Sequence, residues 1–501
     1  MAVHVRPGTR ESELRFRLGV LVLGACIAPA FAAPPPATLP LSACRLQHPD
    51  HLQSIEARCG TLAVPEDRSN PRSPRIHLKV AVIAALDRRA AADPLFILAG
   101  GPGQAATGFY ALVAPAFARV QRERDIVLVD QRGTGDSNAL NCPFPDEDET
   151  VELTPAQLRA HASACLASLQ ADPRFYTTSV AVQDLDAVRA ALGYAQINLY
   201  GVSYGTRVAQ HYLRRFPDNA RALILDGVVP PDAVLAVDGS VNAQRALELI
   251  FARCRADAAC HEVFADPQTQ FDTLRTRLSA TPTRVSLPDP DTGVITPIDL
   301  RLTHLQIATR LLSYAPERAA LMPLILDQAV AHSNYVPLAA QAVIMSKRYV
   351  DVIAYGMHNA VVCTEDMPFI NSARIDRAAL ARSYLGTAQL DGLVDVCREW
   401  PRGVLDPDFH AELKSDRPVL LLSGSADPVT PPLYAERAAH GLSHASQIVL
   451  EGQGHGQLAT GCMPRVMARF LDAGKTTGLD AACTHSIVPD PFFTSFSGPP
   501  P

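Results

Sequence analysis

The sequence predicts an α/β fold in which helices cover both faces of a mostly parallel sheet. Short, wholly apolar segments alternate with segments of helical periodicity in two separate stretches, 75–226 and 418–471. Strands that are apolar throughout are typical of a parallel sheet, because helices bury both faces of such a sheet. Between these stretches helical periodicity dominates. We therefore expect one sheet domain with a helical cap inserted before its last strands.

The first stretch supplies most of the expected sheet. Strands are expected at 75–85, 94–99, 125–130, 197–201 and 221–226, and helices at 183–192 and 204–216. A glycine-rich turn, GGPG at 100–103, follows the second of these strands directly. Gly193 follows the first helix, at the position where glycine commonly ends a helix.

The remaining parts complete the domain organisation. In the insertion, helices are expected at 241–254, 319–331 and 337–353, and the last stretch adds strands at 418–423 and 447–450 and helices at 432–439 and 463–471. The expected division is an export signal at 1–32, a spacer and start of the fold at 33–60, the sheet domain at 61–229 and 418–485, the cap at 230–417 and a tail at 486–501. A long insertion costs little free energy, because loop-closure entropy grows slowly with length.

Composition and charge exclude some classes of protein. The chain has 501 residues, of which 48% are hydrophobic and 19% are charged, a globular composition with enough apolar mass for a large core. The net charge is −6 and no basic stripe is present, so we expect no nucleic acid partner. The sequence contains no repeat of fixed period, and we expect no cofactor.

The N-terminus has the pattern of an export signal. Arg15 and Arg17 precede an apolar run at 18–27, and AFA at 30–32 matches the A-x-A cleavage pattern. The run is too short to span a bilayer as a permanent anchor. A buried N-terminal helix is the alternative interpretation. We expect a secreted or periplasmic protein.

Cys26 allows a second interpretation of the same segment. The sequence LGAC at 23–26 resembles the bacterial lipobox, in which the cysteine is lipidated after cleavage. The protein would then be held at a membrane through a lipid on Cys26. The alternative is an ordinary cysteine in a leader that is removed.

The cysteine count indicates an oxidising compartment. Without Cys26, ten of the eleven cysteines remain, and an even number in an exported protein is typical of disulfides. A metal site at Cys254, Cys260 and His261 is the alternative for one pair, although no second Cys/His cluster completes four ligands. We expect neighbours along the chain to pair as 44–59, 142–165, 254–260, 363–397 and 462–483.

The strongest catalytic signal is the G-x-S-x-G motif GVSYG at 201–205, between an expected strand and an expected helix. A nucleophilic serine here, Ser203, lies on a sharp, strained turn with its hydroxyl exposed above the sheet. Glycine on both sides lets the strand and the helix approach without Cβ clashes. The N-terminus of the following helix favours developing negative charge.

A serine hydroxyl needs a base, and the base needs an acid that orients it. In a fold of this class the acid and then the histidine follow the serine in the chain. Asp427 follows the expected strand 418–423, and His455 lies in the loop GQGHG at 452–456. The alternatives are a turn residue for the aspartate and a surface loop residue for the histidine.

Acyl transfer also needs hydrogen-bond donors for the oxyanion, each worth on the order of 3 kcal/mol. The backbone N–H of Tyr204 is one expected donor, and that of Gly101 in the glycine-rich turn is the other. Pro102 has no N–H and can only shape the turn. A simple Gly-Pro turn is the alternative for this segment.

Five motifs together resemble those of a known family. LAGGPGQ, DQRGTGDS, GVSYGT, SGSADPVTP and GQGHG are similar to motifs of the α/β-hydrolases that include prolyl iminopeptidases and tripeptidyl aminopeptidases. The segment that begins with CREWP at 397–401 resembles the C-terminal domain of the secreted tripeptidyl aminopeptidases. The resemblance implies an α/β-hydrolase fold with Ser203 as nucleophile, Asp427 as acid and His455 as base.

The resemblance also implies an oxyanion hole made by Gly101 and Tyr204. Ala99 stands where the family commonly has histidine. This departure makes the chain less similar to the prolyl-specific branch, but it leaves the backbone donors of the oxyanion hole intact. Family aminopeptidases hold the free amine of the substrate with acidic groups of the cap, for which Glu365 and Asp366 are the candidates. A helix cap or a solvated pair is the alternative for these two residues.

We therefore expect an exported serine hydrolase of the aminopeptidase type, acting on peptides with a free N-terminus and without a metal. A carboxylesterase or lipase with the same triad is the first alternative, and a non-catalytic binding lipoprotein with this fold is the second. Other charged residues are interpreted as braces of loops near the site: Asp130, Arg132, Asp136, Asp184, Asp186 and Asp226.

Overall fold

The computed structural model describes residues 39–49, 51–142, 153–235, 237–290, 292–371 and 375–499. The expected export signal at 1–32 and the lipid-anchor candidate Cys26 lie outside the described residues. Within the described ranges, no helix combines the length and the apolar character that crossing a membrane requires.

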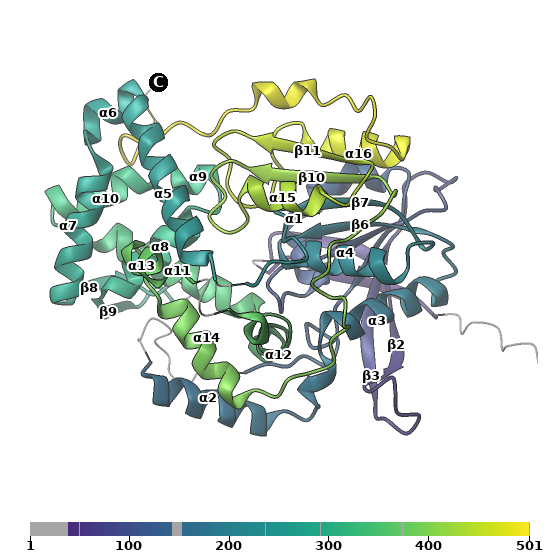
Figure 1. The fold of residues 1–501 in the computed structure, drawn as a ribbon. Coiled ribbons are helices and arrows are strands. Elements are labelled where there is room, and N and C mark those ends of the chain that lie inside the picture. Colours follow the sequence, from purple (N-terminus) through teal and green to yellow (C-terminus); the bar gives the residue numbers. More distant parts are fainter. Residues whose placement is uncertain are drawn as a thin grey trace, which may run out of the picture. The chain divides into compact units, whose positions relative to one another are not determined.

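A sheet of nine strands organises the described part of the chain, in the order β1-β2-β3-β5-β4-β6-β7-β10-β11 (Figure 1). Antiparallel pairing joins β1, β2, β3 and β5, whereas every pair from β5 to β11 is parallel. The carboxyl ends of the parallel strands therefore meet at one edge. The strands are β1 (Ser42–Gln47), β2 (Ser54–Pro65), β3 (Arg75–Ile83), β4 (Leu95–Leu98), β5 (Ile126–Val129), β6 (Ile197–Val202), β7 (Ala220–Asp226), β10 (Val419–Gly424) and β11 (Ala445–Leu450).

The parallel strands are buried on both faces, as their apolar sequences predict. In β4, Phe96 and Leu98 belong to one hydrophobic core and Leu95 and Ile97 to the other, which follows the two-residue period of a strand. The predicted α/β fold with helices on both faces is confirmed. Side chains of α3 (Thr178–Ala191), α4 (Tyr204–Arg215) and α15 (Pro432–Ala439) fill the first core, and those of α1 (Ala106–Gln121) and α16 (Met463–Ala473) fill the second.

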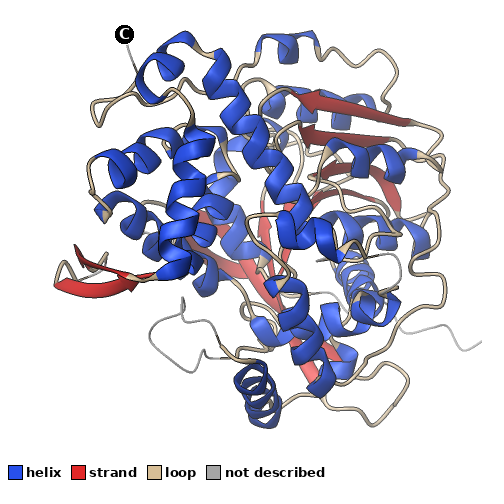
Figure 2. Ribbon diagram, turned by 60° about the vertical axis from the view of Figure 1, so that its left-hand side comes forward, coloured by secondary structure: helices blue, strands red, loops and turns tan. Residues whose placement is uncertain are grey.

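A mainly helical insertion separates β7 from β10 and has a hydrophobic core of its own. Figure 2 shows its one hairpin, β8–β9, as two strands at the edge of a group of helices. The insertion contains α5 (Gly239–Ala256), α6 (Ala258–Phe264), α7 (Pro267–Ala280), β8 (Thr283–Pro288), β9 (Ile295–Leu300), α8 (Leu302–Leu312), α9 (Pro316–Ala319), α10 (Met322–Ala331), α11 (Val336–Val352), α12 (Tyr355–Glu365), α13 (Arg377–Arg382) and α14 (Ala388–Glu399).

One helix from the first part of the sheet domain joins the insertion. Helix α2 (Pro155–Ser168) begins at the capping residue Thr154, whose hydroxyl accepts from the backbone N–H of Gln157. It lies beside α14, and a side-chain ion pair of 2.7 Å between Arg159 and Asp395 joins the two helices (Figure 1). The chain therefore crosses between the two regions more often than a single insertion requires.

Several elements differ from the sequence prediction for physical reasons. Strands β1 and β2 leave one face exposed and therefore lack the continuous apolar runs that mark the parallel strands. Helix α1 contains Pro115, a residue that weakens any helical prediction. The expected helix 319–331 begins later, at Met322 of α10 with Pro323 in its first turn, because Ala319 is the last residue of the preceding α9. The hairpin β8–β9 stands where mainly helices were predicted.

All five expected disulfides are present. The Cys254–Cys260 bond oxidises both thiols of the alternative metal site, so that alternative is wrong. The Cys363–Cys397 bond joins the ends of α12 and α14. The pairs are Cys44–Cys59, Cys142–Cys165, Cys254–Cys260, Cys363–Cys397 and Cys462–Cys483.

Candidate active site

Ser203 lies in the tight turn between β6 and the N-terminus of α4. Its backbone has φ +56° and ψ −124°, a conformation that a residue other than glycine rarely adopts. The backbone N–H of Ser203 donates to the carbonyl of Asp226 at 2.9 Å, and its own carbonyl accepts from the Thr206 hydroxyl at 2.6 Å. These bonds hold the strained turn on both sides.

The two glycines that flank the serine are required by the packing. A Cβ atom at Gly201 would lie 2.3 Å from the carbonyl oxygen of Gly205. A Cβ atom at Gly205 would lie 2.3 Å from the carbonyl oxygen of Leu98 in the neighbouring strand. Both partners are backbone atoms, which cannot move aside. The G-x-S-x-G spacing therefore reflects close contact of strand and helix.

Asp427 follows β10 and is fully buried. Its carboxylate accepts from the backbone N–H groups of Val429 at 2.7 Å and Thr430 at 2.8 Å, and from the Thr430 hydroxyl at 2.8 Å. Three donors from the local turn fix the orientation of the carboxylate. The same carboxylate also contacts the imidazole of His455.

His455 lies in the loop after β11, where Nδ1 contacts a carboxylate oxygen of Asp427 at 2.8 Å. Its backbone N–H donates to the carbonyl of Tyr314 at 2.7 Å, and the Tyr314 ring meets the imidazole edge-on at 5.2 Å. Burial acts to lower the pKa of His455, but the charge and hydrogen bond of Asp427, together with the charge of Asp226, raise this pKa above its ordinary value. The ring is thus oriented and its protonated form is stabilised.

Asp226, at the end of β7, fixes the chain immediately after the histidine. Its carboxylate accepts from the backbone N–H groups of Gln457 at 2.7 Å and Leu458 at 2.9 Å, and from the Tyr200 hydroxyl at 2.8 Å. Burial raises the pKa of Asp226 to about 6 despite these bonds. The expected bracing role agrees with these contacts.

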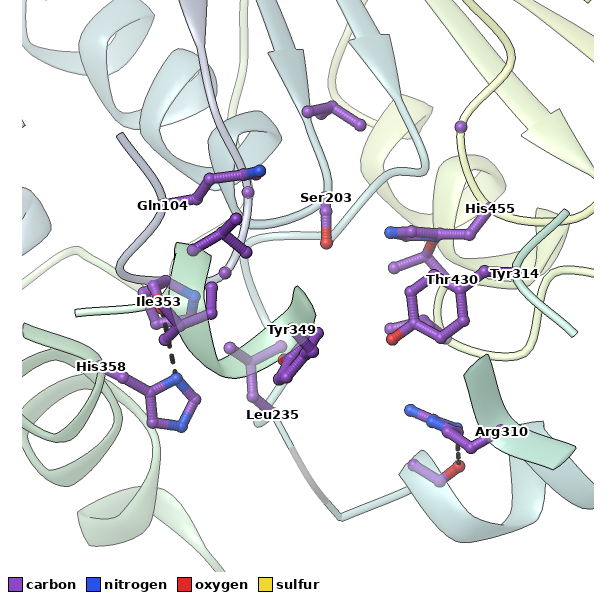
Figure 3. Close-up of a pocket in the computed structure, with 18 of the residues that line it drawn as sticks. Gln104, Ser203, Leu235, Arg310, Tyr314, Tyr349, Ile353, His358, Thr430 and His455 are labelled. Carbon is purple, nitrogen blue, oxygen red and sulfur yellow. Dashed lines mark hydrogen bonds between the residues drawn. The ribbon is translucent and has the colours of Figure 1, made fainter. Parts of the chain in front are cut away.

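Ser203 and His455 line the same cavity, which has a volume of about 470 Å³. Figure 3 shows the serine hydroxyl at the wall of this cavity and a ring nitrogen of His455 turned toward it. The described residues contain no hydrogen bond between the two side chains. Because Nδ1 is engaged by Asp427, Nε2 is the nitrogen left for the cavity.

The glycine-rich turn also lines this cavity. Gly101 has φ +107°, and a Cβ atom there would lie 2.7 Å from the backbone nitrogen of Gly103. The turn is attached to the insertion, since Gly103 accepts from the N–H of Ala354 at 3.0 Å. In the described part of the chain, neither the Gly101 nor the Tyr204 N–H donates a hydrogen bond, so both are free for a ligand.

The predicted amine-binding pair lies elsewhere. Glu365 and Asp366 are fully buried, and neither lines the cavity that contains Ser203. Both terminal nitrogens of the Arg207 guanidinium donate to the carboxylate of Asp366 at 3.0 Å. The carboxylate of Glu365 accepts from the backbone N–H of Thr178 at 2.6 Å. Burial raises the pKa of Glu365 to about 7. The structure corrects the expectation, because these carboxylates bind α12 to α3 and α4 instead of facing a ligand.

Asp130, Arg132 and Asp184 make the expected bracing contacts, whereas Asp136 is exposed and Asp186 lies toward the amino ends of the strands, away from Ser203. The buried Arg132 forms two hydrogen bonds with Asp184, at 2.6 and 2.9 Å. Asp130 accepts from the backbone N–H and the hydroxyl of Thr107, both at 2.9 Å. Asp136 is exposed and lies 3.7 Å from Lys79. Asp186 accepts from Arg189, Tyr212 and Asn219.

Several cavity residues were not found from the sequence, because they come from the insertion and have no motif. They include one carboxylate, two guanidinium groups, two tyrosines and a histidine. Burial lowers the pKa of His358, whose ring lies beside the glycine-rich turn at 3.4 Å from the carbonyl of Pro102 (Figure 3). The cavity-lining residues of this kind are Asp238, Arg310, Arg318, Tyr314, Tyr349 and His358.

Two family models match the chain and agree with this geometry. The model of the alpha/beta hydrolase fold matches residues 93–281, and the model of the TAP-like protein matches residues 382–483. The first match includes Ser203, and the second includes Asp427 and His455. With the parallel sheet and the turn at Ser203, these matches show that the chain has the α/β-hydrolase fold. More particularly, it resembles the tripeptidyl aminopeptidases, as the motifs predicted.

Curated relatives are similar over most of the chain. The serine protease Hip1 of Mycobacterium tuberculosis H37Rv is 26% identical, and the alignment covers 88% of this chain and 90% of that protein. The tripeptidyl aminopeptidase of Streptomyces lividans is 26% identical, with 87% and 85% covered. Carboxylesterase B of Mycobacterium tuberculosis CDC 1551 is 28% identical, with 86% and 87% covered. The names of these relatives support a hydrolase.

Proposed function

We propose that the protein is an exported serine peptidase of the aminopeptidase type, with Ser203, His455 and Asp427 as its catalytic triad. One observation carries the proposal. The imidazole of His455 is oriented by the buried Asp427 at 2.8 Å, and its other nitrogen faces the cavity that Ser203 lines. A serine, a base and an orienting acid in this relation are the requirements of acyl transfer.

The reaction follows from the roles of these groups. His455 Nε2 takes the Ser203 proton as the hydroxyl attacks the scissile carbonyl, and Asp427 stabilises the imidazolium that results. The N–H groups of Gly101 and Tyr204 bind the oxyanion. His455 then protonates the leaving amine, an acyl-enzyme remains on Ser203, and water hydrolyses it with His455 again as the base.

A small rearrangement precedes this reaction, because no hydrogen bond yet joins the hydroxyl to the imidazole in the described residues. Catalytic hydrogen bonds are often long in a ligand-free enzyme and shorten when substrate binds.

Peptides are the favoured substrates. The names of two relatives, a serine protease and a tripeptidyl aminopeptidase, support this class. A free N-terminus would need a carboxylate, and Asp238 is the acidic residue among the described residues that line the cavity. It is exposed and accepts from the Tyr434 hydroxyl at 3.1 Å. Its neighbour Gly239 accepts from Arg310, so Asp238 lies on the histidine side of the cavity, and no carboxylate is assigned to the amine.

Export is supported by the five disulfides, which persist in oxidising compartments. The expected leader at 1–32 would direct the chain there. A lipid on Cys26 remains the alternative to free secretion, and partition of the mature protein into a detergent phase would distinguish the two.

Ser203→Ala tests the proposal. Hydrolysis of chromogenic aminoacyl and tripeptidyl amides should fall by several orders of magnitude while the melting temperature is retained. Unchanged turnover in the folded variant would refute the triad. Free peptides should be cleaved and their N-acetylated forms should not, because acetylation removes the amine.

A carboxylesterase is the second candidate function, favoured by the relative named Carboxylesterase B. It predicts that simple esters are hydrolysed in a Ser203-dependent manner and that acetylated and free peptides are equally poor substrates. A non-catalytic protein would show neither activity and no labelling by a fluorophosphonate.

A further inference from the structure

Two arginines of the insertion line the candidate active-site cavity and form no salt bridge among the described residues. Arg310 lies on α8 and Arg318 on α9, and both are partly buried at the cavity wall. Neither guanidinium forms an ion pair with a carboxylate in the described part of the chain. All other things being equal, a partly desolvated charge without a counter-charge is unfavourable.

The contacts that these arginines do make are weak or neutral. Arg310 donates to two backbone carbonyls, that of Gly239 at 3.2 Å and that of Pro428 at 3.0 Å. A terminal nitrogen of Arg318 lies 3.8 Å from the sulfur of Met345. Burial lowers the pKa of Arg318, as expected for a guanidinium with few polar contacts. The charge of each residue is therefore available to a ligand.

The position of Arg310 relative to the chemistry is given by two ring contacts. Its guanidinium carbon lies 5.9 Å from the centre of the Tyr314 ring, and that ring lies 5.2 Å from the imidazole of His455. Figure 3 shows His455, Tyr314 and Arg310 on the same side of the cavity, opposite Gln104, Ile353 and His358. Arg310 and Arg318 flank Tyr314 in the chain, on α8 and α9.

The side of the cavity decides which part of a substrate meets these arginines. In the mechanism proposed above, His455 protonates the leaving amine, so the leaving peptide lies on the histidine side of Ser203. The acyl part lies on the other side, toward Gln104 and His358. The Arg310 guanidinium lies 5.9 Å from the Tyr314 ring, which lies 5.2 Å from the His455 ring. Taken together, these distances from Arg310 to His455 correspond to no more than about three residues of extended peptide, at about 3.3–3.6 Å per residue.

We propose that Arg310, within about three residues of the cleaved bond, and Arg318, which lines the same cavity, form a carboxylate-binding subsite for the leaving part of the substrate. This inference rests on the proposed function of the same cavity. A planar guanidinium pairs with a carboxylate in a bidentate geometry, so the ligand class is a peptide carboxylate. Its source is either the free C-terminus of a short peptide or an acidic side chain.

Matched peptides separate these two sources. One pair consists of a short peptide with a free N-terminus, as the C-terminal acid and as the C-terminal amide. A second set consists of amidated peptides with Glu or Gln at each of the three positions after the cleaved bond, which mass spectrometry locates. In at least one of these two sets, kcat/KM should be about tenfold or more higher for the peptide that carries the carboxylate (the C-terminal acid, or Glu) than for its neutral counterpart (the amide, or Gln).

Substitutions of Arg318 connect that preference to the subsite. Arg318→Met, which keeps the apolar stem, should lower the kcat/KM ratio of acid to amide severalfold, and Arg318→Glu should lower it further, because Arg310 alone then remains to bind the carboxylate. Arg318→Lys should retain most of the ratio. Arg469→Met removes one positive charge from an exposed residue of α16 and serves as the matched control, with an unchanged ratio.

Two outcomes overturn the subsite: equal kcat/KM for acid and amide in both arms, or a preference that Arg318→Met leaves intact. Protection of Ser203 from a fluorophosphonate by the same peptides provides a readout that needs no peptide hydrolysis. If the serine is labelled and no peptide is cleaved, the proposed peptidase function fails. Preferential protection by the carboxylate forms would still support the subsite, and equal protection would overturn it.

Discussion

The sheet domain and the helical insertion contribute to the same cavity in different ways. The sheet domain supplies Ser203, Asp427 and His455 from turns at the carboxyl ends of β6, β10 and β11, each held by backbone hydrogen bonds. The insertion supplies Arg310 and Arg318, whose charges lack acidic partners among the described residues. The turns that carry the three sheet-domain side chains are fixed before a substrate enters, whereas these two arginines have no salt-bridge partner among the described residues.

This difference separates the reaction from the choice of substrate. The proposed catalytic groups must hold one geometry to within fractions of an ångström, and a dense set of backbone contacts fixes them in place. Groups that select a substrate need a hydrogen-bond donor, acceptor or charge that is not already paired within the protein. The carboxylates Glu365 and Asp366, although part of the insertion, are fully paired with Arg207 and the backbone and therefore cannot select a ligand.

Asp427→Asn should produce the largest effect. Asparagine keeps the shape of the carboxylate but offers an N–H to His455, which favours the wrong tautomer of the imidazole. We expect kcat to fall by about 10⁴-fold with little change in the melting temperature. Steady-state kinetics on a chromogenic peptide amide would measure the loss. A decrease of less than tenfold would show that the sheet domain does not fix the base as described.

A pair of glycine substitutions tests the different packing of the two regions. Gly205→Ala places a Cβ atom 2.3 Å from the Leu98 carbonyl oxygen and should destabilise the protein by about 3 kcal/mol or more. Gly392→Ala, in α14 of the insertion, places its Cβ atom 3.7 Å from Leu158 and should be neutral or stabilising by up to about 1 kcal/mol. Chemical denaturation would measure both, and similar changes for the two variants would contradict this account.

The pH dependence gives a smaller but specific effect. His455 acts as a base only when neutral, and its pKa is raised above its ordinary value despite burial, through the charge and hydrogen bond of Asp427. The acid limb of kcat/KM should therefore lie above the ordinary pKa of an imidazole, and activity should fall as pH decreases through it. In the Asp427→Asn variant, the acid limb of the remaining kcat/KM should move to lower pH, because the carboxylate that raises the pKa of His455 is gone.

A pH–rate profile of both proteins would show this shift. The control is Asp480→Asn, which removes an exposed carboxylate at the surface pair with Arg469 and should leave the limb in place. An acid limb that is the same in the Asp427→Asn variant would mean that another group controls the titration.

The sequence predicts the sheet domain better than the insertion for a physical reason. Strands such as β6 and β10 are buried on both faces, so their apolar runs reveal them, and the chemistry of a strained serine turn requires glycine at 201 and 205. These are local constraints. The order serine, aspartate, histidine then restricts the other two positions to two loops.

The insertion lacks such constraints. Helical periodicity indicated α5 and α11 but could not show which side of each helix faces the cavity, since that depends on packing between distant helices. Glu365 and Asp366 are adjacent acids at the end of α12, and the sequence alone did not reveal that Arg207, on α4, neutralises them. Arg318 follows no motif, so only the fold identifies it.

The central claim, that Ser203 is the activated nucleophile, is tested most directly by locating a covalent label. The native protein is treated with a fluorophosphonate, digested and analysed by mass spectrometry, with Asp427→Asn treated in parallel. We expect one adduct, on the hydroxyl of Ser203, that forms far more slowly in the variant. A folded protein without an adduct, or with the adduct on another serine, would contradict it.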